Sequence, residues 1–154
     1  GARTPIIERI KSFFFGKKEV ERESKGMSDI FLFSNPDRIG SLKVDTFVNA
    51  FQVGSNVILQ NSIREGFGLV VAEAMWKGKA VIGRKAGGIK LQIENGKNGF
   101  LVSSPKEASK RIIQLIKNPQ LAEKLGKAAR ATVKEKFLMP RLLRDYLKLF
   151  KELV

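Results

Sequence analysis

Short apolar runs alternate with longer amphipathic segments along this chain. The runs at residues 29–33, 56–60, 80–83 and 100–102 are too short for typical helices and do not alternate between polar and apolar positions. Such runs are typical of parallel strands that helices cover on both faces. The segments between and after them have the spacing of amphipathic helices. The pattern predicts an α/β fold with a Rossmann-like parallel sheet and flanking helices.

The first 27 residues are expected to form a helix and a linker. Thr4 and Pro5 suit the N-cap and the first position of a helix, and apolar positions recur to about Phe15. The residues that follow are mainly charged and break this pattern. Residues 12–15 are also compatible with a strand, and this alternative stays open.

Residues 28–154 are predicted to form one partial Rossmann-like domain. Polar N-caps, prolines and glycines mark where each of its helices begins and ends. The last helix is expected to carry Leu143, Leu147 and Phe150 on one face. The expected helices are 45–54 with Asp45 as N-cap, 69–76 closed by Gly78, one from Ser104-Pro105 to Asn118-Pro119, one at about 120–136, and one from Pro140 onward.

The composition excludes several kinds of chemistry. The chain has 154 residues, 43% of them hydrophobic, which is enough for a globular core, and it contains no Cys and no His. Thiol nucleophiles, thiolate metal sites and histidine bases are therefore excluded, so acid–base chemistry would fall to Asp, Glu, Lys or Tyr. No apolar run approaches the roughly 18 residues of a membrane helix, and no signal peptide is recognisable. We therefore expect a cytoplasmic protein without a membrane partner.

The net charge of +14 is concentrated at one end of the chain. Residues 105–154 contain 13 basic and 5 acidic residues, and the basic ones fall between apolar positions of the expected helices. A solvated helix face explains this pattern most simply. A nucleic-acid surface is disfavoured, because the chain has a single Tyr and a single Trp for stacking on bases. Attraction to an anionic small molecule or an acidic partner remains open.

The turn between the run at 56–60 and the helix at 69–76 is the main candidate for a binding site. A glycine-containing turn into a helix exposes backbone N–H groups and the positive end of the helix dipole, where phosphate binds. Glu65 in the turn and Glu73 in the helix flank this position. A carboxylate can accept paired hydrogen bonds, as from the two hydroxyls of a ribose. On spacing alone a purely structural turn remains open and is the commoner case.

Several linked motifs resemble the C-terminal donor domain of the family 4 retaining GT-B glycosyltransferases. They are Arg64-Glu65-Gly66-Phe67-Gly68 through Glu73-Ala74-Met75, then Gly87-Gly88, then Asn95-Gly96 with Asn98-Gly99-Phe100-Leu101-Val102. Glu65 and Glu73 match the family pattern of two Glu separated by seven residues. The segments 62–68 and 75–79 are similar to the trehalose-forming members in particular. The resemblance covers roughly residues 28–154.

The resemblance implies roles for individual residues in binding a nucleoside diphosphate sugar such as NDP-glucose. Glu73 is expected to bind the ribose hydroxyls, and Glu65 to lie beside the donor sugar as the catalytic carboxylate. Hexose transfer would proceed with retention, without a metal or another cofactor. The other donor-binding positions are the backbone N–H groups of Gly66, Phe67 and Gly68 for the sugar, that of Leu69 for the diphosphate, and the loop at Ile39 and Gly40 for the base.

The chain also departs from the family pattern. Nothing before Asp29 matches the family's first strand, with its diphosphate-binding Arg and Lys, or its second strand, and no acceptor domain is recognisable. We therefore expect an incomplete GT-B C-terminal domain that is inactive alone. Direct strand pairing, exchange with a second copy, or a complementing N-terminal half would fill the gap in the sheet. The alternative is a non-catalytic module for protein interaction or self-association.

Overall fold

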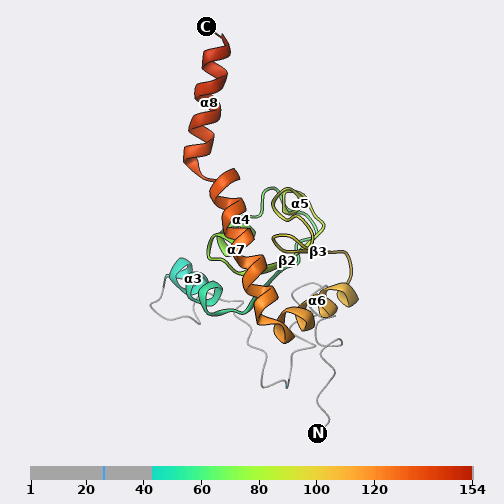
Figure 1. The fold of residues 1–154 in the computed structure, drawn as a ribbon. Helices are drawn as coiled ribbons and strands as arrows, with labels where there is room; N and C mark the ends of the chain where they lie inside the picture. The colour runs from blue at the N-terminus through green and yellow to red at the C-terminus, as the bar shows by residue number, and fades with distance from the viewer. Residues whose placement is uncertain (1–25, 27–42, 154) are drawn as a thin grey trace.

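The computed structural model describes Gly26 and residues 43–153 (Figure 1). The N-terminal helix and linker, the strand at 29–33 and the loop at Ile39 and Gly40 lie outside the described residues. The described elements are α3 (Val44–Gly54), β1 (Val57–Gln60), α4 (Leu69–Trp76), β2 (Ala80–Arg84), α5 (Ile89–Gln92), β3 (Phe100–Val102), α6 (Pro105–Lys117), α7 (Pro119–Lys136) and α8 (Met139–Leu153).

The described strands form one parallel sheet in the order β1-β2-β3. Ala80 pairs with Val57 of β1, and Ile82 pairs with Phe100 of β3, so β2 is the central strand. Four of the five β2 residues are buried, whereas all four of β1 are half-buried. The expectation of short apolar strands in a parallel α/β sheet is confirmed.

Two hydrophobic clusters cover the two faces of the sheet. On one face, Ile82 and Val102 pack with Leu115 of α6 and Leu125 of α7. On the other face, Val81 packs with α4, α5 and the later part of α7, through Met75, Ile89, Ala129 and Val133. Because successive strand residues point to opposite faces, β2 contributes to both clusters. This packing fixes α4, and with it the turn that precedes it, against the central strand.

Capping explains most of the helix limits. Ser104 accepts a hydrogen bond from the Glu107 N–H at 3.2 Å, as expected for the N-cap of α6. Asn118 ends α6 and also caps α7 through the Leu121 N–H at 3.0 Å, so α7 begins at Pro119, within one residue of the expected start. Gly78, at φ 71°, follows α4 as expected.

Two expectations about helix starts differ from the structure, and one short helix was not expected. Lys43 occupies the N-cap of α3 without a side-chain cap, and Asp45 lies inside the first turn, where its charge still suits the helix dipole. The last helix begins at Met139, one residue earlier than expected. The four-residue helix α5 was not predicted, because a segment of this length has no detectable period.

Helix α8 differs from the others because none of its residues is buried. It extends away from the rest of the described molecule (Figure 1). Leu143, Leu147 and Phe150, which were expected on one apolar face, are 61%, 53% and 57% exposed. No helix in the described part of the chain has the length and apolar character that crossing a membrane would require.

Candidate functional site

The turn between β1 and α4 lies at the carboxyl end of β1, the edge of a parallel sheet where ligands bind in open α/β folds. Gly68 is the N-cap of α4 and has φ 89° and ψ 60°, in the left-handed region that favours glycine. Its carbonyl accepts hydrogen bonds from the N–H groups of Val71 at 2.9 Å and Ala72 at 3.3 Å. The N–H groups of Leu69 and Val70 have no intrahelical acceptor at this helix start.

The loop before α5 packs directly against this turn. A Cβ atom on Gly87 would lie 1.6 Å from the carbonyl oxygen of Glu65, and one on Gly88 would lie 2.3 Å from that of Gly66. Only glycine permits this approach of two backbones. The Gly87-Gly88 motif is therefore a packing requirement that holds the turn, and the two loops form one unit.

Four consecutive carbonyl groups of the turn are hydrogen-bonded to the segment that contains α5. The Gly88 N–H donates to the carbonyls of Gly66 at 2.9 Å and Glu65 at 3.3 Å. The side-chain Nε2 of Gln92 donates to the carbonyl of Phe67 and, at 3.3 Å, to that of Gly68.

These four bonds determine which way the opposite side of each peptide faces. In a trans peptide the N–H points away from the C=O, and no peptide in the described residues is cis. The N–H groups of Gly66, Phe67, Gly68 and Leu69 therefore point away from α5. They are the four backbone donors that the sequence motif indicates, and they form a row at the amino end of α4.

Glu73 is exposed on α4 and is linked to a buried amide on α3. Its Oε2 accepts a hydrogen bond from Nε2 of Gln52 at 3.3 Å, and Gln52 is 5% exposed. The Oε1 of Gln52 accepts from Nζ of Lys77 at 2.6 Å. A carboxylate accepts several hydrogen bonds, so the one from Gln52 leaves capacity for further donors. Gln52 thus orients Glu73 without neutralising it.

Glu65 has a similar partner on β1. The Nε2 of Gln60, the last residue of β1, lies 3.5 Å from Oε2 of Glu65 and 2.7 Å from the Ser62 hydroxyl. Glu65 is half-buried, whereas Glu73 is exposed. The two carboxylates flank the row of N–H groups, one in the turn and one on the helix.

Three supporting glutamines, Gln52, Gln60 and Gln92, were missed by sequence reasoning. A neutral amide carries no charge signal and none of the three belongs to a glycine motif, so only the folded geometry reveals them. Among the described residues, no group of three or more His, Cys, Asp or Glu side chains is arranged to hold a metal ion.

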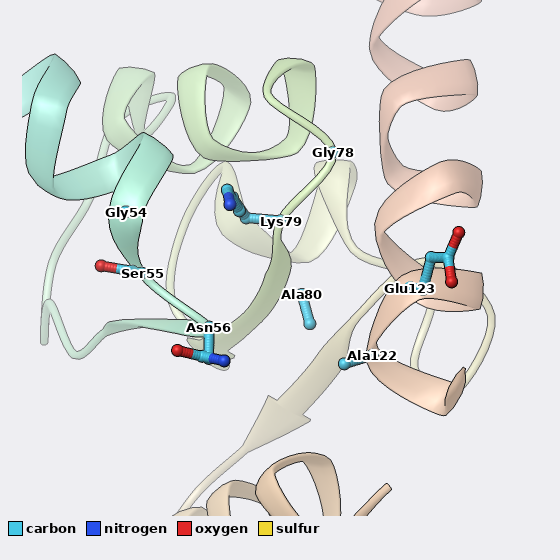
Figure 2. A pocket seen from close by; sticks show the side chains of 8 residues that line it. All are labelled: Gly54, Ser55, Asn56, Gly78, Lys79, Ala80, Ala122 and Glu123. Atoms are coloured by element: carbon cyan, nitrogen blue, oxygen red, sulfur yellow. The ribbon is translucent and has the colours of Figure 1, made fainter. Parts of the chain in front are cut away.

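A separate polar pocket of about 250 Å³ lies at the amino ends of β1 and β2 (Figure 2). Its lining includes Ser55, Asn56 and Lys79, together with Glu123 of α7. A hydrogen bond from Lys127 and its positive charge hold the pKa of Glu123 below its ordinary value. The candidate site is at the carboxyl ends of the strands, so this pocket lies at the opposite edge of the sheet. Ligands of open α/β sheets bind at the carboxyl ends, which favours the candidate site over this pocket.

Comparison with known proteins identifies the class of protein. The family model for glycosyl transferases group 1 matches residues 6–132. A trehalose synthase of Rubrobacter xylanophilus is 45% identical over 129 residues, which are 84% of this chain and 30% of that protein. A trehalose synthase of Thermococcus litoralis is 53% identical over 102 residues, which are 66% of this chain and 25% of that protein.

Solved structures agree with this assignment. Anabaena HepE in complex with UDP-glucose is 25% identical with a TM-score of 0.60, over 68% of this chain and 30% of that one. The C-terminal domain of a Francisella tularensis glycosyl transferase group 1 family protein is 27% identical with a TM-score of 0.61, over 80% of this chain and 63% of that one.

The chain therefore belongs to the group 1 glycosyl transferases. Its described part is a partial Rossmann-like domain of the GT-B kind, and its sequence is similar to trehalose synthases, which confirms the resemblance inferred from the motifs. The chain spans about a quarter to a third of the length of these curated relatives.

Proposed function

We propose that this chain is the donor-binding part of a retaining hexosyltransferase and binds a nucleoside diphosphate sugar, NDP-glucose, as in a trehalose-forming enzyme. The observation that carries the proposal is the row of four outward N–H groups between Glu65 and Glu73. Such donors, at the positive end of a helix, suit a sugar diphosphate. The HepE relative, whose structure contains UDP-glucose, supports the same ligand class.

Within this proposal each group has a distinct role. Glu73 accepts hydrogen bonds from the two ribose hydroxyls, and Glu65 lies beside the transferred sugar as the catalytic carboxylate. The amino end of α4, at Leu69, stabilises the departing diphosphate by an electrostatic contribution. The loop at Ile39 and Gly40 is proposed to contact the base. We expect transfer to need no metal ion.

Calorimetric titration of the full chain with UDP, ADP and GDP tests the proposal. We expect micromolar to millimolar binding of at least one of them, and a loss of roughly tenfold or more in Glu73→Ala, because the paired ribose hydrogen bonds are removed. Glu135→Ala, which removes an exposed glutamate on α7, is the matched control and should bind as the unmodified chain does. A folded chain that binds none of the three nucleotides would overturn the proposal.

A second experiment asks whether the chain transfers hexose from NDP-glucose. The roles proposed above all concern the donor, and none of these groups is assigned to the acceptor. We therefore expect no hexose transfer by this chain alone and restored transfer only with a complementing N-terminal half. Release of nucleoside diphosphate from NDP-glucose in the presence of glucose, measured on the purified chain, is the direct assay. Multiple turnovers by the chain alone would contradict this part.

The exposed face of α8 favours a second function, self-association. Met139, Leu143, Tyr146, Phe150 and Leu153 follow one another at intervals of four, three, four and three residues, and all are exposed. This is the spacing of a two-helix coiled-coil seam. The charged residues of α8 lie outside this seam, so a second copy of α8 meets no like charge there. We propose that copies of this chain pair through α8.

Sedimentation equilibrium between about 1 and 100 µM tests this pairing, because micromolar affinities are typical of weak interfaces. We expect a reversible dimer that Leu143→Lys abolishes, and Lys148→Glu, on the outer face, is the control that should still dimerise. A monomer over the whole range would contradict self-association and leave the donor-binding proposal untouched.

A further inference from the structure

Gln92 is the one side chain that bridges α5 and the candidate donor turn among the described hydrogen bonds. It is 1% exposed and comes from a helix of four residues. Its Nε2 donates to the carbonyls of Phe67 and Gly68, 25 and 24 residues earlier in the chain. These are the carbonyls of the two peptides whose N–H groups belong to Gly68 and Leu69.

The remaining bonds around Gln92 anchor it from behind. Its own carbonyl accepts a hydrogen bond from Nδ2 of Asn98 at 3.0 Å, and the same Nδ2 lies 3.0 Å from the Thr132 hydroxyl of α7. The Asn98 Oδ1 accepts from the Glu94 N–H at 2.7 Å. A chain of hydrogen bonds therefore runs from α7 through Asn98 to Gln92 and then to the turn.

The bonds of its NH₂ group, rather than any bond of its oxygen, fix the orientation of the Gln92 amide. Its Oε1 is buried and has no hydrogen-bond partner there. Buried polar atoms are almost always paired, so an unpaired one indicates a competing requirement. Since both neighbouring acceptors are carbonyls, only the NH₂ side of the amide can face the turn.

We infer that Gln92 is a positioning residue that holds the N–H of Gly68 toward the donor sugar and, together with the first turn of α4, that of Leu69 toward the diphosphate. It acts through the opposite side of two planar peptides and does not contact the ligand itself. The consequence for binding rests on the proposed function, whereas the effect on the turn does not. The other half of the row, at Gly66 and Phe67, is held by the backbone N–H of Gly88 and is independent of this side chain.

The test combines backbone NMR of the ligand-free chain with titration of UDP, ADP and GDP. Gln92→Met keeps the length of the side chain but removes both donated bonds. We expect the amide signals of Gly68 and Leu69 to shift or broaden, while that of Gly66 changes little. We also expect the affinity for whichever nucleotide binds to fall roughly tenfold. Lys90→Met, at an exposed position of the same helix, is the matched control and should leave these signals in place.

A second variant separates positioning from loss of packing. Gln92→Glu keeps the shape, but an ionised carboxylate cannot donate to the two carbonyls, whereas the protonated acid can donate one bond. Burial raises the pKa of such a carboxyl, so the turn signals should return toward those of the unmodified chain as the pH falls from about 8 to 5. Gln92→Met has no titrating group, so its turn signals should not follow pH in this way, and the contrast between the two variants separates the donated bonds from packing.

The outcomes are decisive for each claim separately. Unchanged Gly68 and Leu69 signals in Gln92→Met, or no pH reversal in Gln92→Glu, would overturn the positioning role. If the unmodified chain binds none of the three nucleotides, the proposed function fails, but the NMR result still decides the role of Gln92. If Gln92→Met does not fold, the pH series of Gln92→Glu decides it.

Discussion

Helices α7 and α8 have similar sequences in outline but very different environments. Both are basic and amphipathic, with 18 and 15 residues, and they follow one another along the chain. In α7, Leu125, Gly126, Ala129 and Val133 are buried, whereas no residue of α8 is buried. Amphipathicity therefore predicts that a helix has an apolar face but not whether the chain itself covers that face.

The apolar faces of the two helices differ in whether they contain small residues. The buried face of α7 contains small residues, and a Cβ on Gly126 would lie 1.9 Å from the Gly78 carbonyl oxygen, so the α7 backbone touches the turn between α4 and β2. The face of α8 carries large side chains, including Leu143, Tyr146 and Phe150, which pack best into a matching groove or helix. Small residues among its buried positions let α7 lie close to the body of this domain, whereas α8 has no glycine or alanine and exposes its large side chains.

The same substitution in the two helices is the strongest way to break this comparison. Leu125→Ala should reduce the free energy of unfolding by about 2–5 kcal/mol, because it opens a cavity in the core. Leu147→Ala should change it by no more than about 0.5 kcal/mol at low protein concentration, because Leu147 is 53% exposed. Urea denaturation at two protein concentrations measures both values. Equal losses in a monomeric chain would mean that α8 is packed in solution.

A smaller effect is expected at the close contact of α7. Gly126→Ala should lower the free energy of unfolding by about 1–3 kcal/mol, because the added methyl group meets the Gly78 backbone and forces the helix away. The higher helix propensity of Ala, about 1 kcal/mol, opposes this loss. Ala131→Gly, at an exposed position of the same helix, measures the propensity contribution alone. A stabilised Gly126→Ala would show that the contact with Gly78 is loose.

Much of this fold could be predicted because its signals are local. The limits of α4 and the positions of the three described strands follow from apolar runs and from glycines, and the Glu65–Glu73 spacing follows from a motif. The cap of α3 was assigned wrongly because Asp45 is a better cap by type than Lys43, while the position depends on the backbone before it. Helix α5 was missed because its stability comes from contacts with the turn rather than from its own four residues.

The support of the candidate site could not be predicted for a related reason. Gln52, Gln60 and Gln92 act across α3, β1 and α5 on residues of the turn and α4, and such contacts have no sequence period. The motif therefore identified the groups expected to contact a ligand but not the groups that orient them. Periodicity alone does not predict the exposure of α8, because its pattern is as regular as that of a buried helix.

The smallest expected effect on stability concerns the ion pair between Lys136, at the end of α7, and Glu94. Glu94 accepts from Nζ of Lys97 at 3.0 Å and from Nζ of Lys136, the last residue of α7, at 3.5 Å. In α8 the described ion pair, Arg141 with Asp145, lies within the helix itself. The hydrogen bond and charge of Lys97, followed by those of Lys136, lower the pKa of Glu94 from its ordinary 4.5.

A lowered pKa in the folded state means that the ionised form of Glu94 stabilises the protein. This contribution is fully present above pH 4.5 and is lost as the pH falls through the lowered folded value. Glu94→Gln should therefore reduce stability slightly at pH 7 and not at low pH, and 1 M salt should remove the difference because the pair is exposed. Glu135→Gln on α7, which has no described ion pair, is the control for losing one negative charge. Thermal unfolding at pH 3 and pH 7 measures the change, and a difference that persists at pH 3 would mean that Glu94 anchors the end of α7 by packing rather than by charge.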